Sequence, residues 1–254
     1  MSRPPVTVVD LSGAAPAGIE VAAATHIGPV RTENQDAFAA SPIAGGAGVG
    51  ILVADGMGGL PGGGEAAAAA SAAAVAALVA GDGENLGADV AVQDGNAAVA
   101  RLRDDIGGQP GTTLTVAAVR AGRAVIGHVG DSRAYLVRDG VASALTTDHS
   151  WVGEQVRSGA LPPGSERRHP RRNVITMAAM GEAIEPQVVV VELRPGDVIA
   201  LCSDGFWEPL EDLHIAGLLE TPGPLTAVVG RAAEAALDAG GTDNVTVLGL
   251  RVAR

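Results

Sequence analysis

Short apolar runs recur along the chain and predict β-strands. Two of the gaps between runs carry turn signals, Ala121-Gly122 and Asp139-Gly140, and such dipeptides are typical of β-hairpins. Hairpins join antiparallel strands, so the pattern favours antiparallel sheet over alternating parallel units. The predicted strands cover residues 19–24, 49–54, 113–119, 123–129, 134–137, 141–145, 188–193, 198–202 and 245–250.

Longer segments between the strand clusters predict helices that cover the faces of the sheets, which is an α+β fold. They cover residues 64–80, 89–105, 150–158, 209–219 and 224–239. Without an internal repeat or a low-complexity linker, we expect one domain over residues 1–254. Residues 1–18 are rich in Pro, Ala and Gly and predict a loose leader, in which residues 6–9 could add an edge strand. Residues 145–181 form a long irregular segment.

The charge of the chain and its basic residues argue against several classes of function. Acidic residues outnumber basic ones by 29 to 17, giving a formal charge of −12. This argues against nucleic-acid or anionic-membrane binding, because both need a positive field. All 17 basic residues are Arg. The absence of Lys excludes the phosphate-loop and kinase lysines as well as Schiff-base chemistry.

The cysteine and histidine content argues against an internal disulfide and against a metal site built from histidines. The single Cys202 cannot form an internal disulfide and fits a reducing compartment, so we expect a cytoplasmic protein. The five His residues show no metal-binding spacing. The most apolar run, 66–80, is shorter than the ~20 residues that a membrane span needs, so we expect a buried helix and no membrane partner.

Acidic residues next to strand tips are the most informative pattern. Asp55, Asp131 and Asp204 end or follow apolar runs, and Asp243 precedes one. Several carboxylates that converge at buried strand tips would require cations, and Mg²⁺ or Mn²⁺ prefer such oxygen ligands. The alternative is that Asp-Gly simply makes turns after strands.

The loop at 26–36 supplies the opposite charge. Arg31 stands there among Glu33 and Asp36. An Arg beside a metal cluster suits an anion that bridges the two, and phosphate is the natural bidentate partner. An ordinary surface salt bridge is the alternative.

Seven blocks in this order resemble the metal-dependent type 2C protein Ser/Thr phosphatases in their bacterial form, from about residue 19 to 252. The blocks are GPVRTENQD (28–36), VADGMGG (53–59), GTT (111–113), GDSRAY (130–135), TDHS (147–150), CSDGFW (202–207) and TDNVT (242–246). The resemblance implies a four-layer α-β-β-α sandwich of two mainly antiparallel sheets flanked by helices, with metals at one edge.

The resemblance also implies roles for individual residues. Asp55 would bridge two tightly bound Mn²⁺ or Mg²⁺ ions, and the Gly56 carbonyl would bind one of them. Asp204 and Asp243 would complete the other ion's ligands, and Asp131 would hold a weaker third ion together with Asp204. The catalytic residues would be Arg31, which grips the phosphate, and Asp36, which positions a water.

The implied partners are Ser/Thr-phosphorylated proteins, substrates of bacterial Ser/Thr kinases, and we expect a monomer. The chain departs from the family at three places. Met57 stands where many eukaryotic members have a His, Gln35 stands where some members have Glu, and 176–180 lacks the Arg that bacterial relatives usually carry.

Two other interpretations stay open. Residues 62–67 fit G-x-G-x-x-A, a weak dinucleotide-binding pattern, although hairpins dominate downstream. A catalytically silent binding module of the same fold is the second, but the intact Asp55, Asp204 and Asp243 argue against it. The Arg-rich stretch 167–172 could steer phosphoproteins to the site or be a solvated loop.

Overall fold

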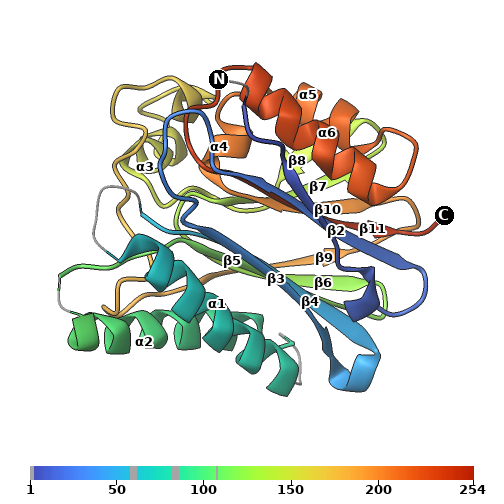
Figure 1. The fold of residues 1–254 in the computed structure, drawn as a ribbon, viewed down its shortest axis with the longest axis horizontal. Helices are drawn as coiled ribbons and strands as arrows, with labels where there is room; N and C mark the ends of the chain where they lie inside the picture. The colour runs from blue at the N-terminus through green and yellow to red at the C-terminus, as the bar shows by residue number, and fades with distance from the viewer. Residues whose placement is uncertain (1–2, 58–61, 82–85, 107) are drawn as a thin grey trace.

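Two antiparallel sheets pack face to face in the computed structural model, which describes residues 3–57, 62–81, 86–106 and 108–254 (Figure 1). The six-stranded sheet runs, in spatial order, β1 (Thr7–Asp10), β2 (Ile19–His26), β11 (Val245–Val252), β10 (Val198–Cys202), β7 (Arg133–Arg138) and β8 (Val141–Ala144). The five-stranded sheet runs β3 (Asp36–Ile43), β4 (Gly48–Asp55), β5 (Leu114–Arg120), β6 (Arg123–Val129) and β9 (Gln187–Glu192).

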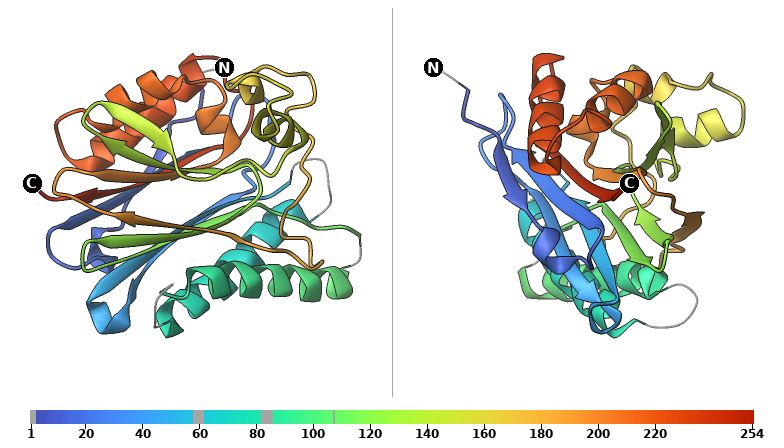
Figure 2. Two further views of the ribbon diagram at one scale, coloured as in Figure 1. Left: turned by 180° about the vertical axis from the view of Figure 1, so that it is seen from behind. Right: turned by 90° about the vertical axis from the view of Figure 1, so that its right-hand side faces the viewer.

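Helices cover both outer faces, as Figures 1 and 2 show, so the expected four-layer sandwich is confirmed. Helices α1 (Gly63–Ala80) and α2 (Ala88–Ile106) lie on the five-stranded sheet, whereas α4 (Asp204–Trp207), α5 (Asp212–Leu219) and α6 (Leu225–Asp238) lie on the six-stranded sheet. Helix α3 (Trp151–Arg157) stands in the long segment between β8 and β9, where Ser150 caps it by accepting from the Gly153 N–H at 3.1 Å.

Alternation along each central strand produces three apolar layers. On β2, Val21 and Ala23 face the opposite sheet, while Ala22 and Ala24 belong to the core beneath α6. Side chains of successive strand residues point to opposite faces, so a strand buried on both faces needs apolar residues at every position. This explains why the central strands are readable as continuous apolar runs in the sequence.

The edges of the sheets differ from expectation. Within the stretch expected to be a loose leader, Thr7–Asp10 forms β1 and pairs with β2, so the edge-strand alternative is the one the structure shows; residues 1–2 lie outside the described ranges. Strand β3 was not predicted, because Asp36, Ser41 and Pro42 interrupt its apolar pattern. Since β3 is an edge strand, it tolerates a proline that a central strand would not.

Helix α1 satisfies the length and composition of a membrane-crossing segment. In the fold, however, its small side chains Ala66, Ala67, Ala70 and Ala74 are fully buried in the core shared with β4 and α2. The Ala-rich surface allows close approach of the helix to the sheet. The 66–80 run therefore belongs to a buried helix, as the sequence predicted.

Candidate active site

Strand ends from both sheets meet at a cavity of about 290 Å³. Asp55 ends β4, Asp131 follows β6 after one glycine, Asp204 begins α4 after β10, and Asp243 precedes β11. The lining consists of Arg31, Asp55, Met57, Thr113, Asp131, Asn173, Ile175, Asp204 and Asp243. The structure therefore brings together four of the predicted carboxylates and the predicted arginine, which are far apart in the sequence.

Threonine hydroxyls and backbone fix the Asp55 main chain. Its N–H donates to Thr113 Oγ1 at 2.9 Å, and its carbonyl accepts from the Thr112 hydroxyl and the Thr113 N–H, each at 2.9 Å. The next residue, Gly56, must be glycine, because a Cβ there would lie 2.4 Å from the Gly63 carbonyl oxygen. Gly58 and Gly59 of the same block lie outside the described residues.

Asn244 connects the loop of Arg31 to the carboxylates. Its side chain accepts from the Gln35 N–H at 2.9 Å and donates to the carbonyls of Ile27 and Glu33 at 2.8 and 2.9 Å. Arg31 Nη2 in turn lies 2.6 Å from Asp243 Oδ2. No role was predicted for Asn244, although it stands in the TDNVT block, and the observed contacts make it the anchor of this loop.

Asp36 lies beside the cavity rather than in its lining. It pairs with Asp55 in the β3–β4 register, and its Oδ2 accepts from the Ser203 hydroxyl at 2.8 Å. Ser203 itself accepts from the Thr246 N–H at 3.0 Å. These contacts place Asp36 next to Asp55, on the neighbouring strand.

Burial and mutual repulsion dominate the electrostatics of the cluster. Desolvation and the charges of Asp36, Asp204 and Asp131 raise the pKa of Asp55 well above its ordinary value. The pKa of Asp204 is also raised by burial and then by Asp131 and Glu208. Burial raises the pKa of Asp36 to about 6 and that of Asp131 to about 7. Such a cluster is destabilising unless protons or cations neutralise it.

The donor set fits divalent cations. Asp36 Oδ1 and Asp204 Oδ1 are buried and have no hydrogen-bond partner in the described part of the chain. Buried polar atoms are normally paired, so unpartnered carboxylate oxygens in an acidic cluster favour hard cations as the missing partners. Across the described ranges, no three acidic, His or Cys side chains already form a coordination shell, and Asp243 is turned to Arg31. The ligand roles therefore stay predictions.

The three departures from the family pattern also have defined places. Met57 lines the cavity, and its thioether has no proton to donate. Gln35 is held through its main chain by Asn244. Ala179, within 176–180, exchanges backbone hydrogen bonds with Thr112 at 2.9 and 3.1 Å, and Arg103 of α2 donates to the Met180 carbonyl at 3.2 Å.

The long segment 145–181 contributes more than the sequence indicated. Asn173 and Ile175 line the cavity, which no local pattern predicted. Three of the four arginines in 167–172 form ion pairs with acidic residues of the α4–α5 region. Arg167 pairs with Asp212, Arg168 pairs with Glu211 at 2.7 Å and Arg172 with Glu208 at 3.1 Å, while Arg171 lies 4.9 Å from the Trp151 ring centre. These contacts attach the segment to the helical layer, so a free solvated loop does not describe it, and the steering of phosphoproteins stays a prediction.

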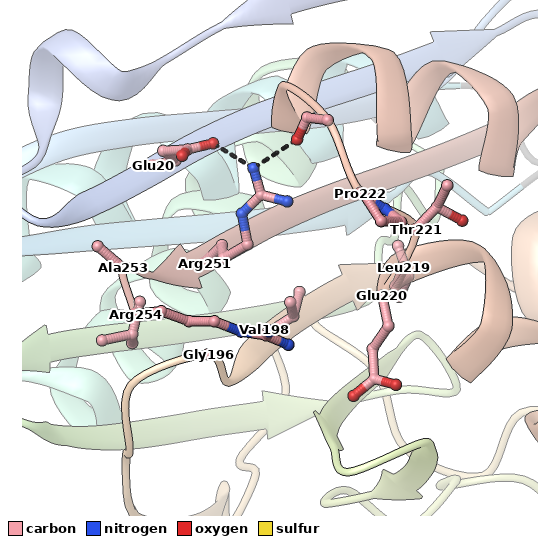
Figure 3. Close-up of a pocket in the computed structure, with 12 residues that line it drawn as sticks. Glu20, Gly196, Val198, Leu219, Glu220, Thr221, Pro222, Arg251, Ala253 and Arg254 are labelled. Carbon is pink, nitrogen blue, oxygen red and sulfur yellow. Dashed lines mark hydrogen bonds and ion pairs between the residues drawn. The ribbon is translucent and has the colours of Figure 1, made fainter.

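A second cavity, of about 320 Å³, lies at the opposite ends of β2, β10 and β11 (Figure 3). Arg251 is the central charge there, and its Nη2 already bonds to Glu20 Oε2 at 2.6 Å and to the Gly223 carbonyl at 2.8 Å. The arginine thus joins β11 to β2 and to the α5–α6 loop, which is a structural role. The carboxylate-lined cavity remains the candidate active site.

A pH dependence follows from the raised pKa values of Asp36 and Asp131. An acid whose folded pKa lies above the unfolded value of ~3.9 binds more protons when folded, so stability falls as pH rises from about 4 to about 7. We expect the Tm of the protein in excess EDTA to fall over this window, and to fall less in Asp131→Asn. Thermal melts of the two proteins check this, and equal slopes would contradict it.

Comparison with known proteins agrees with this geometry. A family model described as Protein phosphatase 2C matches residues 26–229. Serine/threonine protein phosphatase PstP of Mycobacterium tuberculosis is 37% identical over 239 residues, which are 91% of this chain and 44% of that protein. The chain therefore spans less than half of that relative's length.

Solved structures show the same fold. The PPM Ser-Thr phosphatase MsPP from Mycobacterium smegmatis, in complex with cacodylate, is 37% identical with a TM-score of 0.81, covering 91% of this chain and 97% of that one. The catalytic domain of serine threonine protein phosphatase PstP, in complex with two manganese ions, is 32% identical with a TM-score of 0.79, covering 98% and 100%.

Proposed function

The chain belongs to the protein phosphatase 2C family, and on this premise we propose that it hydrolyses phosphoserine and phosphothreonine in proteins with two Mn²⁺ or Mg²⁺ ions. The observation that carries the proposal is the cavity in which Asp55, Asp204 and Asp243 converge from both sheets. The structures of related phosphatases with manganese or cacodylate bound support it.

The carboxylates at the strand ends are the predicted ligands of the ions. Asp55, the Gly56 carbonyl, Asp204 and Asp243 would hold the two ions, and Asp131 with Asp204 a weaker third. When bound, the ions supply an activated water and neutralise phosphate charge. Ligand oxygens on rigid strand ends would need little rearrangement to bind the ions.

The chain's own groups bind and orient the substrate. Arg31, at the cavity wall, is placed to grip the phosphate, and Asp243 keeps the guanidinium oriented until the phosphate arrives. Asp36, next to Asp55 on the neighbouring strand, would accept a hydrogen bond from the attacking water. Met57 cannot donate a proton, so this side chain does not protonate the leaving oxygen. Because a water is the attacking group, the mechanism needs no phosphorylated enzyme group.

The relatives also guide the proposals about substrates and location. They are Ser/Thr phosphatases of bacteria, so we infer that this chain acts on proteins phosphorylated by bacterial Ser/Thr kinases, as a monomer in the cytoplasm. The acidic balance of 29 to 17 residues supports a partner other than nucleic acid or an anionic membrane.

Hydrolysis of a generic phosphoester with Mn²⁺ and with excess EDTA tests the proposed function. We expect turnover with the ion and none with the chelator. Turnover that persists in EDTA would contradict the metal-dependent reaction. A folded protein that binds Mn²⁺ but releases no phosphate would instead indicate a binding module.

Arg31→Ala should raise KM about tenfold with a smaller change in kcat, because a charge-assisted hydrogen bond contributes ~1.5–3 kcal/mol and acts in the ground state as well as the transition state. Steady-state kinetics on a phosphopeptide check this. Arg120→Ala, an exposed arginine at the β5–β6 turn, is the control and should match wild type. A change confined to kcat would assign Arg31 to the transition state alone.

A further inference from the structure

Asp131 is held by an aromatic side chain from the other sheet's helical layer. Its backbone carbonyl accepts a hydrogen bond from the indole Nε1–H of Trp207, on α4, at 3.0 Å. Both residues are buried, with Trp207 2% and Asp131 7% exposed. The contact fixes the main chain at the point where the Asp131 carboxylate enters the cavity. It joins two blocks that are separate in the sequence, GDSRAY and CSDGFW.

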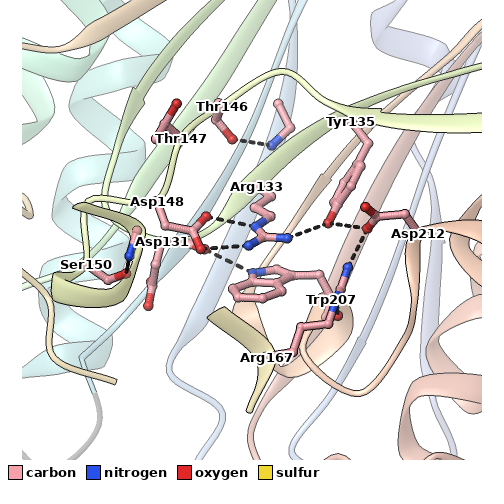
Figure 4. Close-up of polar contacts among 12 residues, drawn as sticks. Asp131, Arg133, Tyr135, Thr146, Thr147, Asp148, Ser150, Arg167, Trp207 and Asp212 are labelled. Atoms are coloured by element: carbon pink, nitrogen blue, oxygen red, sulfur yellow. Dashed lines mark hydrogen bonds and ion pairs between the residues drawn. The ribbon is translucent and has the colours of Figure 1, made fainter. Parts of the chain in front are cut away.

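The Trp207 ring is held in turn by Arg133, whose guanidinium carbon lies 3.5 Å from the ring centre (Figure 4). Arg133 donates to both carboxylate oxygens of Asp148 at 2.8 and 2.7 Å, and to the Tyr135 hydroxyl at 3.0 Å. A buried, bidentate ion pair leaves the guanidinium a single orientation. The stacked indole therefore also has a single orientation.

Asp148 connects this arrangement to the long segment 145–181. It stands shortly before Ser150, which caps α3, and this segment supplies Asn173 and Ile175 to the cavity wall. The contacts thus run from the segment that borders the cavity, through Asp148, Arg133 and Trp207, to the Asp131 main chain (Figure 4).

We propose that Trp207 is a positioning residue for Asp131: its indole N–H holds the Asp131 main chain so that the carboxylate is directed at the weaker third cation. This rests on the proposed function, because it assumes that Asp131 and Asp204 bind that cation. The Arg133–Asp148 pair fixes the indole, so the segment 145–181 contacts the Trp207 ring through Asp148 and Arg133.

Trp207 contributes a hydrogen bond to the Asp131 carbonyl in addition to its packing in the core. A phenyl ring at position 207 would still fill space in the core and contact Arg133, but it would leave the Asp131 carbonyl without its donor. Groups that orient metal ligands typically change metal affinity ~10- to 100-fold when removed. A purely structural tryptophan would change stability and leave ion affinity alone.

Trp207→Phe, compared with Trp151→Phe, tests the proposal. Trp151 is the chain's other tryptophan and contacts Arg171 and His169 in the segment 145–181. Free Mn²⁺ is measured by electron paramagnetic resonance as the ion is titrated into each protein. We expect wild type and Trp151→Phe to bind two tight ions and a third in the millimolar range. Trp207→Phe should keep the tight pair and bind the third ~10-fold more weakly.

A double mutant separates positioning from packing. In an Asp131→Ala background, where the third ion loses its ligand, Trp207→Phe should change the titration no further. If Trp207→Phe does not fold, β-(3-benzothienyl)alanine at position 207, which keeps the two-ring shape but lacks the N–H, replaces it and should give the same weakening.

Each outcome has a defined meaning. Third-ion isotherms that superimpose for wild type and Trp207→Phe would overturn the positioning role and leave the proposed function intact. A wild type that binds only two ions would overturn it as well. A wild type that binds no Mn²⁺ would overturn the proposed function itself.

Discussion

Asp204→Asn is expected to lower kcat at least ~100-fold while leaving the fold unchanged, because it removes a predicted charged ligand of the ions that would neutralise charge in the transition state. Asp204 begins α4 at the cavity, and its Oδ1 is buried without a hydrogen-bond partner in the described ranges. The amide keeps the shape of the carboxylate and removes its charge, so metal binding should weaken.

The same substitution removes repulsion from Asp131, Glu208 and Asp243. In the absence of ions, Asp204→Asn should therefore be at least as stable as wild type. Phosphopeptide kinetics and thermal melts in EDTA are the measurements. Asp238→Asn, on the exposed surface of α6, is the matched control and should keep the wild-type rate. Near-wild-type turnover of Asp204→Asn would show that Asp204 is not a ligand.

Asp148→Ala should lower the free energy of unfolding by about 3–5 kcal/mol, the cost of leaving one partner of a buried ion pair uncompensated. The Arg133 side chain is 10% exposed and that of Asp148 is 4% exposed, and the pair is bidentate. Removal of Asp148 leaves the buried guanidinium with the Tyr135 hydroxyl and the Trp207 ring as its neighbours.

Urea unfolding followed by circular dichroism measures this effect. Glu20→Ala is the control, because it breaks a more exposed pair with Arg251 and should cost no more than about 1 kcal/mol. If Asp148→Ala costs as little as Glu20→Ala, the buried pair does not stabilise the fold as argued.

Much of the fold could be predicted because its central strands are buried on both faces and therefore read as apolar runs. Strand β3 was missed because an edge strand needs less apolar sequence, and Asp36, Ser41 and Pro42 interrupt it. Strand β1 agrees with the possible edge strand that the apolar residues 6–9 indicated within the leader, and it pairs with β2.

The candidate site could be predicted as far as its carboxylates, because each stands next to a buried strand whose tip lies at the same end of the sandwich. The residues that orient them could not. Trp207, Asn244 and Ser203 act through contacts with residues distant in the sequence, at Asp131, Gln35 and Asp36. Only the tertiary structure reveals such partners.

The cavity wall formed by the segment 145–181 could not be predicted from the sequence either. Asn173 and Ile175 line the cavity because Arg167 and Arg172 attach the segment to Asp212 and Glu208. Residues 167–172 have no helical or strand periodicity, so their ion pairs could not be assigned beforehand. The charge of the arginines indicated that they could steer phosphoproteins to the site. In the structure, three of them pair with acidic residues of the same chain.

Measuring metal content shows directly whether the carboxylate-lined cavity binds two ions. After EDTA treatment, reloading with Mn²⁺ and removal of loosely bound ion, elemental analysis of the wild type should give two ions per chain. Asp55→Asn, which changes the residue predicted to be shared by both ions, should retain markedly less. A wild type that retains no Mn²⁺, or an Asp55→Asn protein that retains two ions, would contradict the assignment of this carboxylate-lined cavity as a two-metal centre.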